Sequence, residues 1–178
     1  MEEQIKQYTV CALTENKPGV LHRLSNLFAK RKINVSSLTV SETENEGYSR
    51  FTITINATES KVDLICKQIT KIIEVASAHY YSDEHLIATE VALFKYEVSK
   101  TDEADFKKVV NAHDAEIKAR IDDCVAVQKV GKESEINEFR KQMHKYKLVE
   151  FVRSGRIVLF GFIPRPNGRG IKPLEIII

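Results

Sequence analysis

The sequence of 178 residues contains few cysteines, and they form no recognisable pattern. Cys11, Cys66 and Cys124 are odd in number and lie far apart, so they match neither a disulfide framework nor the spacing of zinc ligands. We therefore expect three buried or half-buried thiols in a reducing cytoplasm.

The sequence also lacks a long apolar run and a marked charge of one sign. No stretch approaches the roughly 20 apolar residues that span a bilayer. The charged N-terminus MEEQIKQYTV has no apolar core of the kind that export signals carry. The formal net charge is +2 and the charges are interspersed. This pattern does not indicate binding to a nucleic acid, an anionic membrane or an acidic substrate. With 43% hydrophobic residues, the chain is expected to be a soluble, cytoplasmic globular protein.

No catalytic or metal-binding motif is recognisable. The sequence has no GxGxxG fingerprint and no P-loop. The candidate histidines pair with neither cysteine nor carboxylate at a ligand or triad spacing; they are His22, His79, His113 and His144. We predict no catalytic residue and no metal site in this chain.

What the sequence does have is a pattern of strands and helices that occurs twice. In the first half, alternating apolar residues predict strands and a period near 3.6 predicts helices. The order is β-α-β-β-α-β, over Tyr8–Leu13, a helix from Val20, Val35–Val40, Arg50–Asn56, Lys61–Lys71 and Ile73–Tyr81. Asn16 and Ser60 are expected to cap the two helices.

The same order repeats after a polar break over 82–85. The predicted elements are Ile87–Val98, a helix capped by Thr101, the hairpin Ala115–Ile121 and Cys124–Val130, a helix over Lys132–His144, and strands over Leu148–Val152 and Arg156–Phe162. A βαββαβ unit forms a ferredoxin-like sandwich, in which two helices cover one face of an antiparallel sheet. We therefore predict an α+β fold of two tandem ferredoxin-like domains, over 1–83 and 84–162, and a Pro/Gly-containing tail over 163–178.

The turn before the first helix has the groups to hold a small charged ligand. A helix N-terminus offers free N–H groups and a partial positive charge, which attract a carboxylate. Gly19 lets a ligand approach the backbone, and the amides of Asn16 and Asn34 supply donors and acceptors. We expect the end of the first strand and the start of the second to share a rim of the sheet. Two interpretations stay open: the turn holds an amino acid, or Asn16 is only a cap and Asn34 only a turn residue.

An RNA-recognition domain has the same order of elements. Its signature on the third strand requires a basic residue, Gly, an aromatic residue, a small residue and a second aromatic residue. The equivalent run Glu46–Phe51 has Glu46 at the basic position and Arg50 at the second aromatic position. The base-stacking platform is incomplete and its charge is unfavourable, so an RNA-binding module is the less favoured alternative.

Residues Leu13–Leu24 and Ile33–Val40 resemble the N-terminal ACT domain of the acetolactate synthase (acetohydroxyacid synthase) small, regulatory subunit. The resemblance continues through Ser49–Ile53 and Lys67–Val75. The N-E/K-x-G-V/A-L piece is common to many ACT domains. The pieces x-N-I/V-x-S-L-T-V and K-Q-x-x-K-x-x-E/D-V are more specific to this family, so residues 1–83 are identified as its ACT domain.

The second half of the chain resembles the C-terminal, ACT-like domain of the same family. Thr89–Lys95 looks like the family's R-E-x-x-L-x-K strand, with Thr89 in place of Arg. Glu150–Val158 looks like its E-x-x-R-S/T-G segment, and the match covers most of residues 6–160. The departures are Val110–Ile117, where the family has F-R-G-x-I-x-D, and the Pro/Arg/Gly tail.

The resemblance implies a non-catalytic regulatory subunit in branched-chain amino-acid biosynthesis. In this family the subunit binds a large catalytic subunit, raises its activity and confers feedback inhibition by valine or another branched-chain amino acid. The thiamine diphosphate, Mg and FAD belong to the large subunit, so no cofactor is expected in this chain. The alternative within the ACT class is a free-standing amino-acid sensor.

The resemblance also implies a homodimer that holds its effector between two ACT domains. The matching effector-binding positions are Asn16, Gly19, Val20 and Leu21 of one chain and Asn34 and Val35 of the other.

Overall fold

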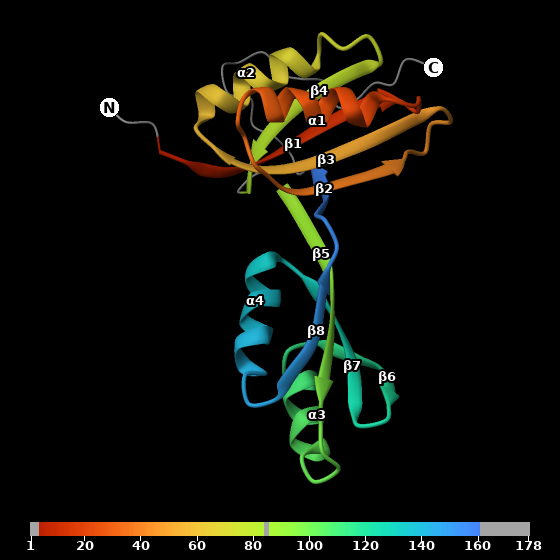
Figure 1. Cartoon of the computed structure of the whole chain (residues 1–178), viewed down its shortest axis with the longest axis vertical. Coiled ribbons are helices and arrows are strands. Elements are labelled where there is room, and N and C mark those ends of the chain that lie inside the picture. Colours follow the sequence, from red (N-terminus) through yellow and green to blue (C-terminus); the bar gives the residue numbers. More distant parts are fainter. Residues whose placement is uncertain (1–3, 84–85, 161–178) are drawn as a thin grey trace.

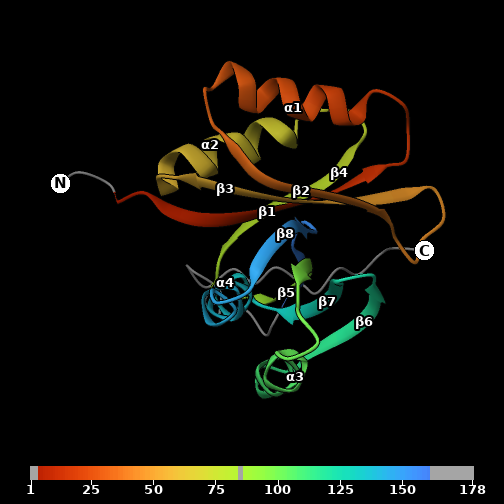
Figure 2. The ribbon, with the colours of Figure 1, turned by 60° about the horizontal axis from the view of Figure 1, so that its bottom comes forward.

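The computed structural model describes residues 4–83 and 86–160, which form two layered domains placed end to end (Figure 1). In each domain two helices cover one face of an antiparallel sheet (Figures 1 and 2). The predicted α+β fold with two ferredoxin-like units is confirmed. The predicted 163–178 tail lies outside the described residues.

The first domain contains β1 (Lys6–Glu15), α1 (Val20–Lys30), β2 (Val35–Glu42), β3 (Tyr48–Ala57), α2 (Glu59–Ile69) and β4 (Val75–Ser82). Its strands lie in the order β2-β3-β1-β4. Helices α1 and α2 cover the sheet face that is turned away from the second domain (Figure 1). The opposite face of this sheet is therefore available to contact the second domain.

The second domain contains β5 (Leu86–Glu97), α3 (Glu103–Ala112), β6 (Ala115–Ile121), β7 (Cys124–Gly131), α4 (Glu133–Gln142), β8 (Lys147–Arg153) and β9 (Ile157–Phe160). The sheet order is β6-β7-β5-β8. Strand β5 is long enough to pair with β8 along one half and with β9 along the other. The break between the last two predicted strands falls at Ser154-Gly155, which separates β8 from β9 and lies beside the first domain (Figure 1).

Side-chain alternation explains why each sheet has one helix-covered face. On β5, Ala92, Phe94 and Tyr96 are buried under α3 and α4, because successive side chains of a strand point to opposite faces. The Phe94 ring meets Phe139 of α4 edge-on, with ring centroids 5.2 Å apart. The apolar stripe of each helix thus fits the apolar face of its own sheet. None of the helices within 4–83 and 86–160 is long and apolar enough to cross a membrane.

The predicted helix caps are wrong by one to three residues. The helices begin at the N-caps Gly19, Thr58 and Asp102 rather than at the predicted Asn16, Ser60 and Thr101. None of the three observed N-caps makes a side-chain capping bond. The Asn16 amide instead donates to Glu42. Polar residues that are close in sequence compete for the same short-range bonds, so spacing alone does not select the cap.

Replacing Phe139 with alanine should destabilise the second domain strongly. The side chain is fully buried against Phe94, and a Phe→Ala cavity in a core costs about 3–5 kcal/mol. Urea unfolding followed by far-UV circular dichroism measures the loss. Ile73→Ala is the matched control, because Ile73 is 93% exposed and its loss should stay within about 0.5 kcal/mol. Equal losses in both variants would contradict the assigned core.

Candidate functional site

The turn after β1 is fixed by contacts to the β2–β3 loop. The backbone N–H of Asn16 donates to the Gly47 carbonyl over 2.7 Å, and its side-chain Nδ2 donates to Glu42 Oε1 over 3.0 Å. An amide whose N–H group is held by a carboxylate presents its carbonyl oxygen as an acceptor. The turn therefore combines a carboxylate and an amide oxygen, which suit an ammonium group.

The next part of the turn opens the helix. Gly19 has φ +86° and is the N-cap of α1, and a Cβ at this position would meet nothing within 4 Å. Val20 is buried in the core, whereas Leu21 is 47% exposed on the surface of the helix. The first N–H groups of α1 lack partners within the helix, so they can receive a carboxylate above an open glycine backbone.

Asn34 and Val35 do not lie at this end of the sheet. Strands β1 and β2 both pair antiparallel with β3, so they run in the same direction. Glu15 is paired with Tyr48 and Val35 with Ile55, which places the two groups about 23 Å apart along β3 at 3.3 Å per residue. The expectation of a shared rim is wrong, because α1 carries the chain back to the other end of the sheet. Within one chain, the six predicted residues therefore form two separate groups.

The exposed charges around the turn are already paired. Arg23 Nη2 lies 2.6 Å from Glu74 Oε1, and Lys17 Nζ lies 2.5 Å from Glu15 Oε2. The hydrogen bond from Lys17 to Glu15 raises the pKa of Lys17. No cation among these residues competes with the helix N-terminus for an incoming carboxylate.

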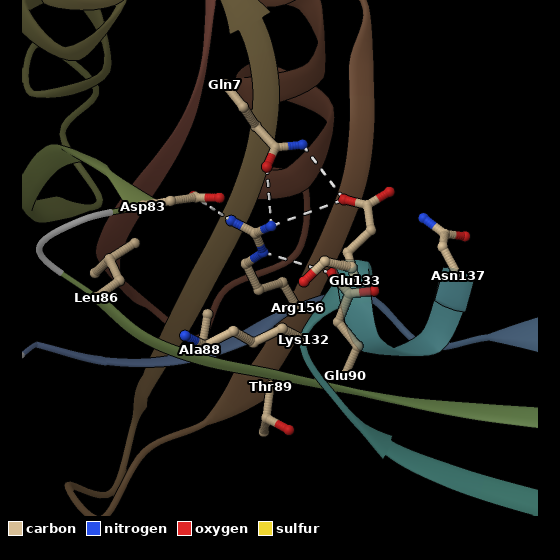
Figure 3. A pocket seen from close by; sticks show the side chains of 11 residues that line it. Gln7, Asp83, Leu86, Ala88, Thr89, Glu90, Lys132, Glu133, Asn137 and Arg156 are labelled. Atoms are coloured by element: carbon tan, nitrogen blue, oxygen red, sulfur yellow. Dashed lines mark hydrogen bonds and ion pairs between the residues drawn. The ribbon is translucent and has the colours of Figure 1, made fainter. Parts of the chain in front are cut away.

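A second place of interest is a cavity of about 380 Å³ between the two domains (Figure 3). One of the charged side chains that line it is Arg156, which is only 5% exposed. The guanidinium reaches first-domain acceptors at Gln7 Oε1 (2.9 Å) and Thr9 Oγ1 (3.3 Å). It also donates to Asp83 Oδ1 at 2.6 Å, just after β4. Residues far apart in sequence thus meet at one buried cation.

The second domain completes this charge cluster. Glu90 of β5 lies 3.5 Å from Arg156 Nε and 3.3 Å from Arg153 Nε, and it is almost fully buried. Glu133 at the start of α4 binds Arg153 Nη1 over 2.9 Å and lies 3.8 Å from Arg156 Nη2. The Arg153 hydrogen bond holds the pKa of Glu133 below its usual value. We call these residues the Arg156 junction: Gln7, Thr9, Asp83, Glu90, Glu133, Arg153 and Arg156.

Neither of the two buried cysteines offers an activated nucleophile. Burial raises the pKa of the Cys11 thiol to about 11 and that of the Cys66 thiol to about 12, which suppresses the reactive thiolate. Cys124 is half-buried, so the predicted burial of the three thiols is confirmed. Across the part of the chain that the structure describes, no cluster of His, Cys, Asp and Glu side chains could hold a metal ion.

Sequence reasoning located the turn but missed the Arg156 junction. One signal was present: Glu90 interrupts the apolar alternation of a strand, and Arg153 and Arg156 flank Ser154-Gly155. A buried charge requires a partner, so the sequence offered Arg153 and Arg156 as candidate partners for Glu90. The partners Gln7 and Thr9 carried no such signal, because both alternate normally on β1.

Two family models match the chain, one for each domain. Residues 11–77 match a model described as an acetohydroxyacid synthase (AHAS) small subunit-like ACT domain. Residues 89–160 match a model described as the small subunit of acetolactate synthase. Together they span both observed sheets.

Curated relatives and a solved structure agree with these models. An acetolactate synthase small subunit of Mycobacterium bovis is 30% identical over 154 residues, covering 86% of this chain and 92% of the relative. One from Bacillus subtilis is 28% identical, with 79% and 82% covered. The crystal structure of the acetolactate synthase small subunit from Thermotoga maritima has a TM-score of 0.81 and 28% identity, covering 90% of this chain and 100% of that one.

Gly19→Ala should destabilise the first domain although there is room for the methyl group. The cost arises from the backbone, because an L-residue at φ +86° loses about 1–2 kcal/mol. Lys32→Gly is the matched opposite change, since Lys32 has φ +53° and should gain stability on losing its Cβ. If Gly19→Ala and Lys32→Gly shift the urea midpoint of unfolding in the same direction, the positive φ angles assigned to these turns are contradicted.

Proposed function

Because this chain belongs to the family of acetolactate synthase small subunits, we propose that it activates a large catalytic subunit and confers feedback inhibition by valine or another branched-chain amino acid. The prediction that it is a small regulatory subunit rather than a catalytic one is confirmed by these relatives. The observation that carries the proposal is the match of both halves to small-subunit models. Partner, activation and effector are the proposed part.

The large catalytic subunit is the proposed partner, and it carries the proposed thiamine diphosphate, Mg and FAD. A pull-down with that subunit tests the partnership directly. Acetolactate formation by the reconstituted enzyme should exceed that of the large subunit alone, and this chain alone should form none. Failure to bind and activate the large subunit would instead favour a free-standing amino-acid sensor.

The effector is proposed to lie between two copies of the first domain. Its carboxylate would meet the N-terminus of α1 at Gly19, Val20 and Leu21, and its ammonium group would meet Asn16. Asn34 and Val35 would come from the other copy. Their distance from Asn16 within one chain supports this arrangement, because only a second copy can bring the two groups together.

The free edge of β2 supports a side-by-side dimer. Strand β2 ends the sheet order, so one row of its backbone groups has no strand partner within the described sheet. Leu38 and Val40 expose apolar side chains on this edge strand, at 39% and 44%. Pairing two β2 edges would build one eight-stranded sheet and cover both side chains.

Sedimentation equilibrium at micromolar concentration should give twice the mass of the chain. Val40→Lys should shift the sample toward monomer, because it places a charge in the proposed interface. Ile121→Lys is the matched control, a change at an exposed apolar position on the second domain, where Ile121 is 61% exposed. A wild type that is monomeric with and without valine would refute the dimer. Dissociation by Ile121→Lys alone would show that the dimer interface does not lie at β2.

Asn34→Ala should remove valine inhibition while leaving activation intact. A hydrogen bond to a charged group contributes about 1.5–3 kcal/mol, so its loss weakens binding roughly ten- to a hundredfold. Asn34 is exposed, so its truncation should leave the fold stable. Valine titration of the reconstituted enzyme measures the effect, after equal thermal midpoints have excluded a folding defect.

Asn111→Ala is the matched control for this experiment. It removes the same amide from an exposed position on α3, far from the turn. Its inhibition curve should follow the wild type. An unchanged curve for folded, activating Asn34→Ala would show that the effector site is wrongly placed.

A further inference from the structure

The Arg156 junction fixes how the two domains meet. A guanidinium is a planar fork with five N–H donors. The three nitrogens of Arg156 reach acceptors on Gln7, Asp83, Glu90 and Glu133 (Figure 3), and also on Thr9. Because these acceptors come from both domains, a rotation of one domain would lengthen several bonds at once. It would also leave a buried charge poorly paired, which is strongly unfavourable.

The backbone beside Arg156 is equally constrained. A Cβ on Gly155 would lie within 2.2 Å of Thr39 Oγ1 and 3.2 Å of the Leu38 carbonyl, so only glycine lets this segment approach β2. Thr39 Oγ1 donates to the Arg156 carbonyl over 3.2 Å. The second domain therefore contacts β2 through its backbone as well as β1 through the Arg156 side chain.

These two strands lead to the proposed effector residues. Strand β1 runs from Gln7 and Thr9 to the turn at Asn16, and β2 starts at Val35, four residues before Thr39. Hydrogen-bonded strands are rigid elements through which a shift at one end reaches the other. A ligand that moves either strand end would displace acceptors that hold Arg156.

We propose that the Arg156 junction couples occupancy of the first domain to the orientation of the second domain. Arg156 is thus a positioning residue rather than an effector-binding one. The transmission step rests on the proposed function, whereas the fixing of the domains does not. The cavity beside the junction is not assigned a ligand, because its buried charges lie in ion pairs with one another.

Three variants test this coupling. Arg156→Met keeps the aliphatic stem and removes all the donors, and Arg156→Lys keeps the charge but loses the planar fork. Gly155→Ala keeps every charge and forces the segment away from β2, so it serves if Arg156→Met fails to fold. Arg120→Met is the matched control, because Arg120 pairs with Glu103 and the Val98 carbonyl inside the second domain alone.

The orientation itself is measured by the distance between spin labels at Ile73→Cys and Asn111→Cys. Cys124→Ser removes the half-buried thiol, and the buried Cys11 and Cys66 stay unlabelled. An excess of unlabelled chain limits each assembly to one labelled copy. The distance distribution should broaden about twofold in Arg156→Met and Gly155→Ala and stay narrow in Arg120→Met. A wild-type width in both junction variants overturns the proposal.

Transmission is measured with L-valine and the reconstituted enzyme. The residual activity at saturating valine should rise about threefold or more in the junction variants, while the valine Kd of the isolated subunit changes less. Arg156→Lys should fall between Arg156→Met and the wild type. Full inhibition in variants with a broadened distribution overturns the coupling. A wild type that neither binds valine nor is inhibited refutes the proposed function, and the distance measurement still decides whether the junction fixes the domains.

Discussion

A buried guanidinium needs an acceptor for every donor, and this requirement sets the relation between the two domains. Each sheet is complete with its own helices, so neither domain requires the other for its core. Arg156 is different, because Gln7 and Thr9 supply acceptors that the second domain lacks. The two carboxylates Glu90 and Glu133 each face both Arg153 and Arg156, which turns single ion pairs into a network. This network of charges and hydrogen bonds joins the two domains at Arg156.

The geometry of the first domain divides its proposed binding groups between two ends of α1. Parallel β1 and β2 place Asn16 and Asn34 at opposite ends of the sheet, whatever the details of the turn. In the proposed site, a single copy offers the helix N-terminus and the Asn16 amide, and a second copy supplies the rest. The proposal therefore connects regulation with assembly, because the free β2 edge also begins at Val35.

The sequence predicted the elements well because their signals are local. Alternation on β1 and β5 and the apolar stripes of the helices placed the strands and helices within a few residues. For the hairpin across Asp122-Asp123, the predicted first strand has the same bounds as β6. The caps were less well predicted, because several polar residues near each helix start compete for the same short-range bonds. The shared rim was wrong because the direction of β2 depends on the crossover made by α1.

The sequence by itself determined the two ferredoxin-like halves, the family resemblance and the turn around Gly19. Periodicity, turn residues and motif spacing are properties of neighbouring residues, so they can be recognised without coordinates. Only the tertiary structure decided that Arg156 is buried against Gln7 and Thr9, nearly 150 positions earlier in the chain. It also decided that Gly155 is required by the approach to β2 rather than by a positive φ. Both depend on how two folded domains meet, and no local pattern records which surface atoms become neighbours across that contact.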